Sequence, residues 1–422
     1  MPHQEALTII AKLDPRRVAA LQPVLDELRR DPTKNSVLPF GALPDCHFGR
    51  VLFMPATADL QGQPIAPQLI LLSDCDGPAN DHLERVVDVA KDGLDQLFGA
   101  CESYPTRPAT RASRLAFLRR NRVQVDANYV HRQGRTVEQI RREAQLRAAL
   151  QELLGDHGFG EVPAVEVRKR ILAYVRNTER WSWALHKPPS VGFGFRARNA
   201  LDLAALPLGL VALGPIVVPL ATLIIGLVRF AELRDPSDHI RPSVEHVQRL
   251  AELEDFFAHN GFTAGGYVKP GLVRQAVLRS VLKLIGWGTR HLFTRDSLAG
   301  VKSIHFARWI PLDGGKRVVF ASNYDGSLEN YNNDFIDLVS WGLNLVFSNG
   351  FGYPETNWLV FGGATREQEF KDYLRRHQIP TPAWYSAYPH LTALQIERNA
   401  ALRAGLSGRM NEREAQRWLR LF

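Results

Sequence analysis

Three side chains that can carry chemistry, a histidine, an arginine and an aspartate, recur twice in the chain with the same neighbours. Each set reads His-Phe-x-Arg and is followed by an Asp-Gly pair. The sets are His47, Arg50 and Asp76 in the first half, and His305, Arg308 and Asp325 in the second. A carboxylate in a turn at the mouth of a cavity can transfer a proton. We therefore take His305, Arg308 and Asp325 as candidate catalytic residues.

A purely structural role, with no catalytic chemistry, explains the same residues equally well. An Asp-Gly pair between a strand and a helix is common turn chemistry, and a duplicated fold duplicates its turns. A strand histidine is more often a hydrogen-bonded core residue than a ligand. The second half is the more polar near its turn, where Asn323 and Tyr324 precede Asp325. If one half is active, we therefore expect it to be the second.

The recurrence extends beyond these residues and indicates an internal duplication. In both halves a Tyr-Pro pair begins 28 positions after the aspartate, at 104 and at 353. Segments 127–150 and 383–406 also align without a gap over 24 positions. Two copies of roughly domain size indicate duplication rather than a solenoid.

Hydrophobic periodicity predicts the same order of elements, βαββαβ, in both copies, which is the ferredoxin-like unit. The predicted first-copy strands are 5–13, 47–55, 68–73 and 122–130; those of the second copy are 262–269, 305–311, 317–322, 357–361 and 383–388. On a regular strand, His305 and Arg308 would face opposite sides of the sheet. The predicted fold class is α+β, with ferredoxin-like repeats at 1–155 and 262–422 and a helical, membrane-associating insertion at 156–261.

The insertion contains an uncharged run from Leu203 to Val228. Its 26 residues would extend roughly 39 Å as a helix, enough to span a bilayer. Prolines at 207, 215 and 219 are expected to break the run into pieces too short to cross. Arginines on both flanks favour the cytoplasmic side for both ends. The sequence thus predicts a monotopic or re-entrant hairpin at 203–228 on the cytoplasmic face of a membrane; a buried core hairpin is the alternative.

Charge and composition favour a lipid partner. The net charge is +8 and the pI about 9.5, which suits an anionic partner. The sequence has no recognition-helix, zinc-finger or RNA-binding pattern, so we expect no nucleic-acid partner. Segments 164–176 and 272–293 mix basic and apolar residues at helical spacing, as helices in the headgroup region do. A packed helix with a solvated basic face is the alternative for each.

The tandem units and their strand-end Asp-Gly turns resemble the dye-decolourising peroxidases and related dimeric α+β barrel proteins. The family motif is Gly-x-x-Asp-Gly, which here reads Ser-x-x-Asp-Gly at 73–77 and 322–326. The resemblance covers the repeats, about half of the chain. It implies haem between the sheet and helices of one unit, with Asp325 as the distal acid, Arg308 as the distal arginine, and His377 or His390 as the candidate proximal ligand.

Two classes of function follow from these patterns. The first is a membrane-associated oxidoreductase, a haem-dependent peroxidase or oxygenase whose lipid or other apolar small-molecule substrate enters from the bilayer. The second is a non-catalytic membrane-bound module that binds lipid or protein; a cofactor-free barrel monooxygenase is a narrower alternative. The resemblance favours the enzyme, and the lack of a complete catalytic set favours the module. The sequence leaves a homo-oligomer open.

Overall fold

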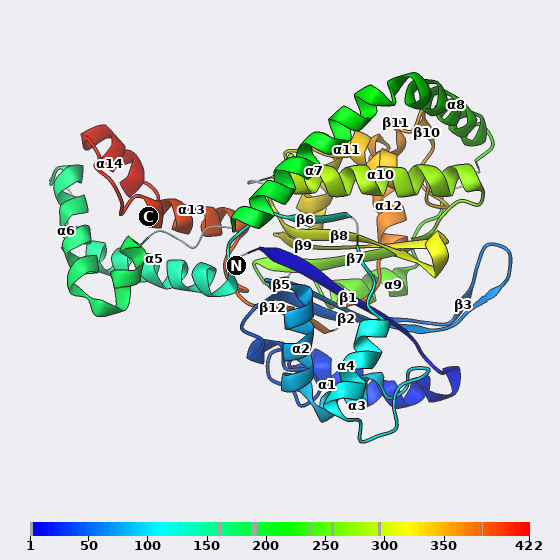
Figure 1. The fold of residues 1–422 in the computed structure, drawn as a ribbon, viewed down its shortest axis with the longest axis horizontal. Helices are drawn as coiled ribbons and strands as arrows, with labels where there is room; N and C mark the ends of the chain where they lie inside the picture. Colours follow the sequence, from blue (N-terminus) through cyan, green and yellow to red (C-terminus); the bar gives the residue numbers. More distant parts are fainter. Residues whose placement is uncertain are drawn as a thin grey trace.

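Two four-stranded antiparallel sheets lie face to face at the centre of this α+β protein, and helices cover their outer faces (Figure 1). The computed structural model describes residues 3–125, 127–157, 162–186, 192–235, 239–254, 257–293, 297–381 and 383–422. The predicted α+β class is confirmed.

Each sheet takes three strands from one half of the chain and the fourth from the other half. The first sheet has the order β1 (Gln4–Lys12), β5 (Gln68–Asp76), β2 (Cys46–Met54), β12 (Ala383–Ser386). The second has the order β6 (Ala127–Val130), β8 (Ile304–Leu312), β9 (Arg317–Asp325), β7 (His259–Tyr267). The predicted placement of the last strand within its own repeat is therefore wrong. Each last strand crosses over and pairs along a hairpin strand of the other half, which would otherwise be an open sheet edge.

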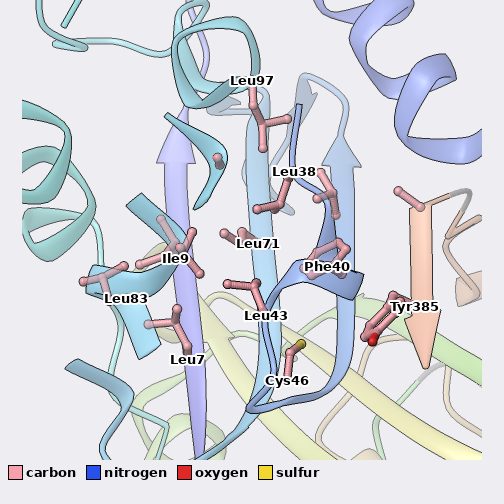
Figure 2. Close-up of a cluster of buried hydrophobic side chains, with 14 of the residues drawn as sticks. Leu7, Ile9, Leu38, Phe40, Leu43, Cys46, Leu71, Leu83, Leu97 and Tyr385 are labelled. Carbon is pink, nitrogen blue, oxygen red and sulfur yellow. The ribbon is translucent and has the colours of Figure 1, made fainter. Parts of the chain in front are cut away.

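Four helices cover the outer face of the first sheet: α1 (Gln22–Arg30), α2 (Ala79–Ala90), α3 (Asp92–Phe98) and α4 (Arg111–Arg120). Alternation along the strands directs every second residue outward, so Leu7, Ile9 and Leu71 meet Leu83 and Leu97 of the helices (Figure 2). The second sheet is covered in the same way by α10 (Leu272–His291), α11 (Leu328–Phe347) and α12 (Glu367–His377).

The inner faces of the two sheets pack on each other. Leu52, Ile70 and Leu72 of the first sheet share an apolar cluster with Ile310 and Val319 of the second. Strands β2 and β5 are consequently buried on both faces, which explains their nearly continuous apolar runs.

A helical appendage lies at the side of the sandwich (Figure 1, left). It comprises α5 (Val137–His157), α6 (Ala164–Asn177), α13 (Ala393–Ala404) and α14 (Glu412–Leu419). Val167 and Ile171 of α6 are buried there against Leu402 and Trp418 from the C-terminal helices. The headgroup role expected for 164–176 does not suit this packed helix. Helix α6, which lies in the predicted insertion 156–261, packs in this appendage, and α9 (Val244–Ala251) follows later in the same segment.

Two consecutive helices, α7 (Phe193–Ala212) and α8 (Gly214–Glu232), form what we call the apolar arm. They run along the outside of the helices that cover the second sheet (Figure 1). Pro207 and Pro219 lie inside the helices, and the chain breaks only between Leu213 and Gly214. The predicted breaks at Pro207 and Pro219 are therefore wrong, since a single proline removes one helical hydrogen bond and the exposed helix continues past it. The predicted break at Gly214-Pro215 is confirmed.

Hydrogen bonds fix the apolar arm to the body at two places, the middle of α7 and the end of α8. The indole nitrogen Nε1 of Trp287 on α10 donates to the backbone carbonyl of Asp202, at 3.1 Å. At the end of α8 the buried Glu232 carboxylate accepts from the Thr356 hydroxyl and from the Trp358 and Leu359 backbone N–H groups, each at 2.9 Å. Thr356 belongs to a small hairpin of β10 (Thr356–Asn357) and β11 (Phe361–Gly362); a second one is formed by β3 (Thr57–Ala58) and β4 (Pro64–Ile65). Both helices of the arm are thus bonded to the second half of the body.

Candidate functional site

The duplicated histidines and aspartates form two equivalent pairs in the space between the sheets. His47 Nε2 lies 2.9 Å from Asp76 Oδ1, and His305 Nε2 lies 2.7 Å from Asp325 Oδ1. Each histidine lies where the pairing of its strand slips by one residue, between 46 and 48 in β2 and between 304 and 306 in β8. Such a β-bulge changes the direction of a side chain. It turns both histidines toward the opposite sheet, where His305 meets Phe48 and His47 meets Phe306.

The second carboxylate oxygen of each aspartate holds the start of a helix. Asp76 Oδ2 accepts from the Val137 backbone N–H at 2.8 Å, and Asp325 Oδ2 accepts from the Ala393 N–H at 2.7 Å. A carboxylate stabilises a helix N-terminus because the first N–H groups have no partner within the helix. The Asp-Gly turns therefore have a structural role in both halves, and the following glycines adopt the positive φ angles, 78° and 79°, that such turns require.

A third ionisable group joins the pair in the second half only. His259 opens β7 and pairs directly with Asp325 in the sheet register. One nitrogen of His259, one of His305 and one Asp325 oxygen all lie within 4.8 Å of one another. The two rings stack with centroids 4.7 Å apart. The equivalent position in the first half is Gln4, which pairs with Asp76 in β1. We call His259, His305 and Asp325 the His-His-Asp cluster.

The His-His-Asp cluster is buried among aromatic rings. His259 is 0% exposed and His305 2%, while the Asp325 side chain retains 13% exposure. Phe48 and Tyr388 pack against both rings. Burial, reinforced by the neighbouring His305, lowers the pKa of His259 to about 3, so this imidazole is neutral at pH 7. Burial acts to raise the pKa of Asp325, but His305 and the Ala393 N–H outweigh it and lower the pKa.

Arg308 lies on the same inner face of β8 but binds a different set of groups. Its guanidinium donates to the Leu7 and Ser73 carbonyls at 2.9 and 3.0 Å, and it also pairs with the Asp74 carboxylate. The prediction that His305 and Arg308 face opposite sides is wrong, because the bulge at His305 interrupts the alternation. Arg308 is 3% exposed and ties the two sheets together.

Arg50 makes the mirror-image contacts in the opposite direction. It donates to the Phe262 and Ser322 carbonyls, at 2.9 and 2.8 Å, and to the Asn323 side-chain oxygen. Where Arg308 meets the carboxylate of Asp74, Arg50 thus meets a neutral amide. Burial accordingly lowers the pKa of Arg50 to about 10. We call Arg50 and Arg308 the arginine latch.

The residues predicted for haem do not assemble a haem site. The cavity beside His377 has a volume of about 30 Å³, the share of a single water molecule in the liquid. Burial lowers the pKa of His377 to about 4, and its Nδ1 lies 2.8 Å from the Tyr373 carbonyl. His390 is exposed in the turn before α13. Neither histidine shares a cavity with Asp325 or Arg308 among the described residues, so we derive no step through haem.

A larger apolar cleft lies between the arm and the helices of the second half. Its volume is about 530 Å³, within the roughly 300–1,000 Å³ of small-molecule sites. Its walls include Leu206 and Leu210 of α7, Leu284 and Trp287 of α10, and Trp341 and Gly342 of α11. None of its described lining residues is a histidine, cysteine, methionine or tyrosine, the side chains that ligate haem iron. The cleft therefore suits an apolar molecule rather than a haem.

Sequence reasoning paired His305 with Asp325 but missed His259. The predicted strand began at 262, three residues too late, so His259 was not seen as the residue opposite Asp325. The predicted strand starts, at 5 and 262, set Gln4 against Gly261; the sheet pairing with Asp76 and Asp325 sets it against His259. Tyr388, which bonds His47 Nδ1 at 2.8 Å, was likewise missed because it comes from the crossing chain after β12.

Comparisons with known proteins assign no class to this fold or cluster. No protein-family model, curated protein or solved structure matches the chain. The geometry of the protein is therefore the basis of the proposed function.

Proposed function

We propose that the protein is a membrane-associated module that inserts its apolar arm into one leaflet and holds an apolar ligand, such as a lipid acyl chain, in the adjacent cleft. The observation that carries the proposal is the exposure of the arm. Eleven large apolar side chains between 203 and 227 are exposed, among them Leu208, Val211 and Ile216 at 67% or more. Extended exposed apolar surfaces mark the sites where a protein contacts a membrane or another protein.

Charge at the ends of the arm supports a lipid surface as the partner. Arg196 and Arg198 near the start of α7 are exposed, as is Arg234 after α8. On the neighbouring α10, Lys283 and Arg290 are exposed on either side of Trp287. Basic residues and tryptophan around an apolar helix suit the headgroups of an anionic leaflet.

The attachment of both arm helices to one body supports a monotopic arrangement. Among the described residues, α8 is the one helix long and apolar enough to cross a membrane. At about 1.5 Å per residue its 19 residues extend roughly 28 Å. A single crossing by α8 would put Asp202 and Glu232 on opposite sides of the bilayer, although both are bonded to the same body. We therefore place the arm within one leaflet, on the cytoplasmic face.

We also infer that the chain is a duplicated pair of ferredoxin-like units whose last strands have been exchanged. The two halves share their strand order, the bulge at the histidine, the His-Asp pair and the arginine of the latch. The exchange lets the two sheets face each other as in a dimeric barrel, with both partners in one chain.

Vesicle flotation tests the membrane proposal. We expect the protein to float with anionic phospholipid vesicles and to stay bound in about 1 M salt, where screening acts beyond roughly 3 Å. Detergent should release it, since apolar burial rather than charge supplies most of the binding. Complete release by salt, or no flotation at all, would reject an inserted arm.

Labelling of introduced cysteines tests the orientation. The native Cys46, Cys75 and Cys101 are free but buried, so they should give little background. Arg196→Cys and Arg234→Cys should both react with an impermeant reagent from the same side of a membrane. Reaction from opposite sides would establish a crossing helix and overturn the monotopic arrangement.

Gly342→Phe separates ligand binding from membrane binding. Gly342 lines the cleft on α11, where a bulky side chain would occupy the space. We expect a fluorescent fatty acid to bind about 10-fold more weakly, since overfilling a site costs on the order of 1–3 kcal/mol. Flotation should not change, because the exposed surface of the arm is intact. Unchanged fatty-acid binding would show that the cleft is not the ligand site.

A further inference from the structure

We propose that His259, His305 and Asp325 bind a divalent first-row transition-metal ion, of the Zn²⁺ or Fe²⁺ class, in the second half of the protein only. The proposal is independent of membrane binding. It stands on three potential ligand atoms, one from each residue, that lie within 4.8 Å of one another. The described residues contain no other such group of histidine, cysteine and acidic side chains.

The contacts of the two ring nitrogens of His259 suit a metal ligand. Its Nδ1 lies 3.2 Å from the Ser386 hydroxyl, while its buried Nε2 makes no hydrogen bond of ordinary geometry among the described residues; the Tyr388 and Leu391 backbones lie near enough to the ring to act to raise its pKa. Leaving a buried polar group unpaired costs about 1–3 kcal/mol, so native structures rarely do it without a reason. In metal sites, one imidazole nitrogen binds the ion while a hydrogen bond to the other fixes the ring. The contacts of the two ring nitrogens of His259 match that arrangement.

The first half supplies an internal comparison. Gln4 occupies the position of His259, and its amide is fully engaged. It donates to the Arg135 carbonyl at 2.6 Å and to Asp76 at 3.3 Å, and it accepts from the Gly134 N–H at 2.8 Å. In the first half, the Gln4 amide therefore fills the position beside the His47–Asp76 pair through hydrogen bonds alone. The histidine of the second half instead has one ring nitrogen, Nε2, buried without a hydrogen bond of ordinary geometry among the described residues.

The ligand set indicates the kind of ion. Two imidazoles and one carboxylate are the donors of catalytic zinc sites and of non-haem iron sites, whereas Mg²⁺ and Ca²⁺ prefer oxygen ligands. Ligands at about 2.0–2.2 Å from an ion lie roughly 3–3.5 Å apart, so binding requires adjustments of on the order of 1 Å. His305 and Asp325, now 2.7 Å apart, would move slightly apart, and His259 would move toward them. The hydrogen bond between His305 and Asp325 would give way to bonds with the ion. Asp325 would keep Ala393 on its other oxygen.

The site has an open side for a further ligand. Asp325 is the partly exposed member, and the two histidines close the interior side. Three protein ligands leave a position for water, which is the arrangement of catalytic rather than structural zinc sites.

Titration of the full-length protein with Zn²⁺ tests the proposal. After treatment with a chelator, we expect the protein to bind one equivalent in calorimetry and to gain thermal stability. Co²⁺ should give visible absorption bands from the bound ion. His259→Gln installs the residue of the first half at this position. Its Zn²⁺ affinity should fall by more than the roughly 10–100-fold that the loss of an outer hydrogen-bonding partner causes.

The matched control is His377→Gln, which removes a partly buried histidine outside the cluster. It should bind Zn²⁺ like the unmodified protein, and Asp325→Asn should weaken binding as His259→Gln does. Equal affinity for the unmodified protein and His259→Gln would overturn the site. If the substituted proteins fail to fold, the titration of the unmodified protein still tests the proposal. If that protein neither binds one equivalent of Zn²⁺ nor gives a Co²⁺ spectrum, the proposal is overturned.

Discussion

Replacing Arg308 by methionine should lower the free energy of unfolding by about 3–5 kcal/mol, the usual loss when one partner of a buried ion pair is removed. The Arg308 guanidinium joins β1 and β5 of the first sheet to β8 of the second. Without it, the Asp74 carboxylate, 4% exposed, would keep only the Asn323 amide as a side-chain donor among the described residues, at 3.2 Å. Urea unfolding followed by circular dichroism measures the change.

Arg50→Met is the matched control for this prediction. Arg50 makes equivalent bonds to two carbonyls and a threonine, so the same kinds of hydrogen bond are lost. Its fourth partner is the neutral Asn323, so no carboxylate is left alone. We therefore expect a smaller loss at Arg50 than at Arg308. Adding Asp74→Asn to Arg308→Met should recover part of the loss; equal losses at the two arginines, or no recovery, would show that charge does not govern the latch.

The sequence predicts local elements well because their signals are local. The hairpin strands of the second half, predicted at 305–311 and 317–322, lie within β8 and β9. The helix predicted at 328–347 is α11, and the terminal helix follows the predicted start at Thr392, whose side chain caps it. Apolar periodicity and capping chemistry act over a few residues, and no distant contact overrides them here.

The bulges and the strand exchange depend on distant parts of the chain and could not be predicted. An alternating pattern assigns His305 to one face, but pairing with β9 slips at that residue and turns it to the other. The last strand of each half could join its own sheet by local pattern alone. Only the register between the halves, as between Trp384 and Arg50, assigns it to the other sheet. The candidate site was therefore found in part, without His259.

The proline positions show a third limit of prediction from the sequence. Pro207 and Pro219 predict helix ends, yet α7 and α8 pass through them. Each proline removes one backbone hydrogen bond, and the rest of each helix is long enough to continue. The true break falls at Leu213 and Gly214, beside Pro215, where proline occupies the first turn of the next helix.

Placing two aspartates on the apolar arm, Ile216→Asp with Leu223→Asp, should abolish membrane binding. The two positions are 67% and 60% exposed on α8 and lie seven residues apart, on one face of the helix. A charge at the centre of a membrane helix costs about 2.5–3.5 kcal/mol. Two such charges should therefore weaken partitioning into vesicles by roughly 1,000-fold or more. Flotation at several lipid concentrations measures the change.

The same substitutions should leave folding almost unchanged, which separates a membrane surface from a buried core hairpin. Exposed positions usually change the free energy of unfolding by no more than about 0.5 kcal/mol. Leu394→Asp, on the exposed side of α13 in the appendage, is the matched control and should float like the unmodified protein. If the double variant floats as before, the arm does not enter the bilayer. If it instead loses several degrees of thermal stability in the absence of lipid, the arm is packed against protein in solution, and its apolar surface belongs to an interface between copies of the chain.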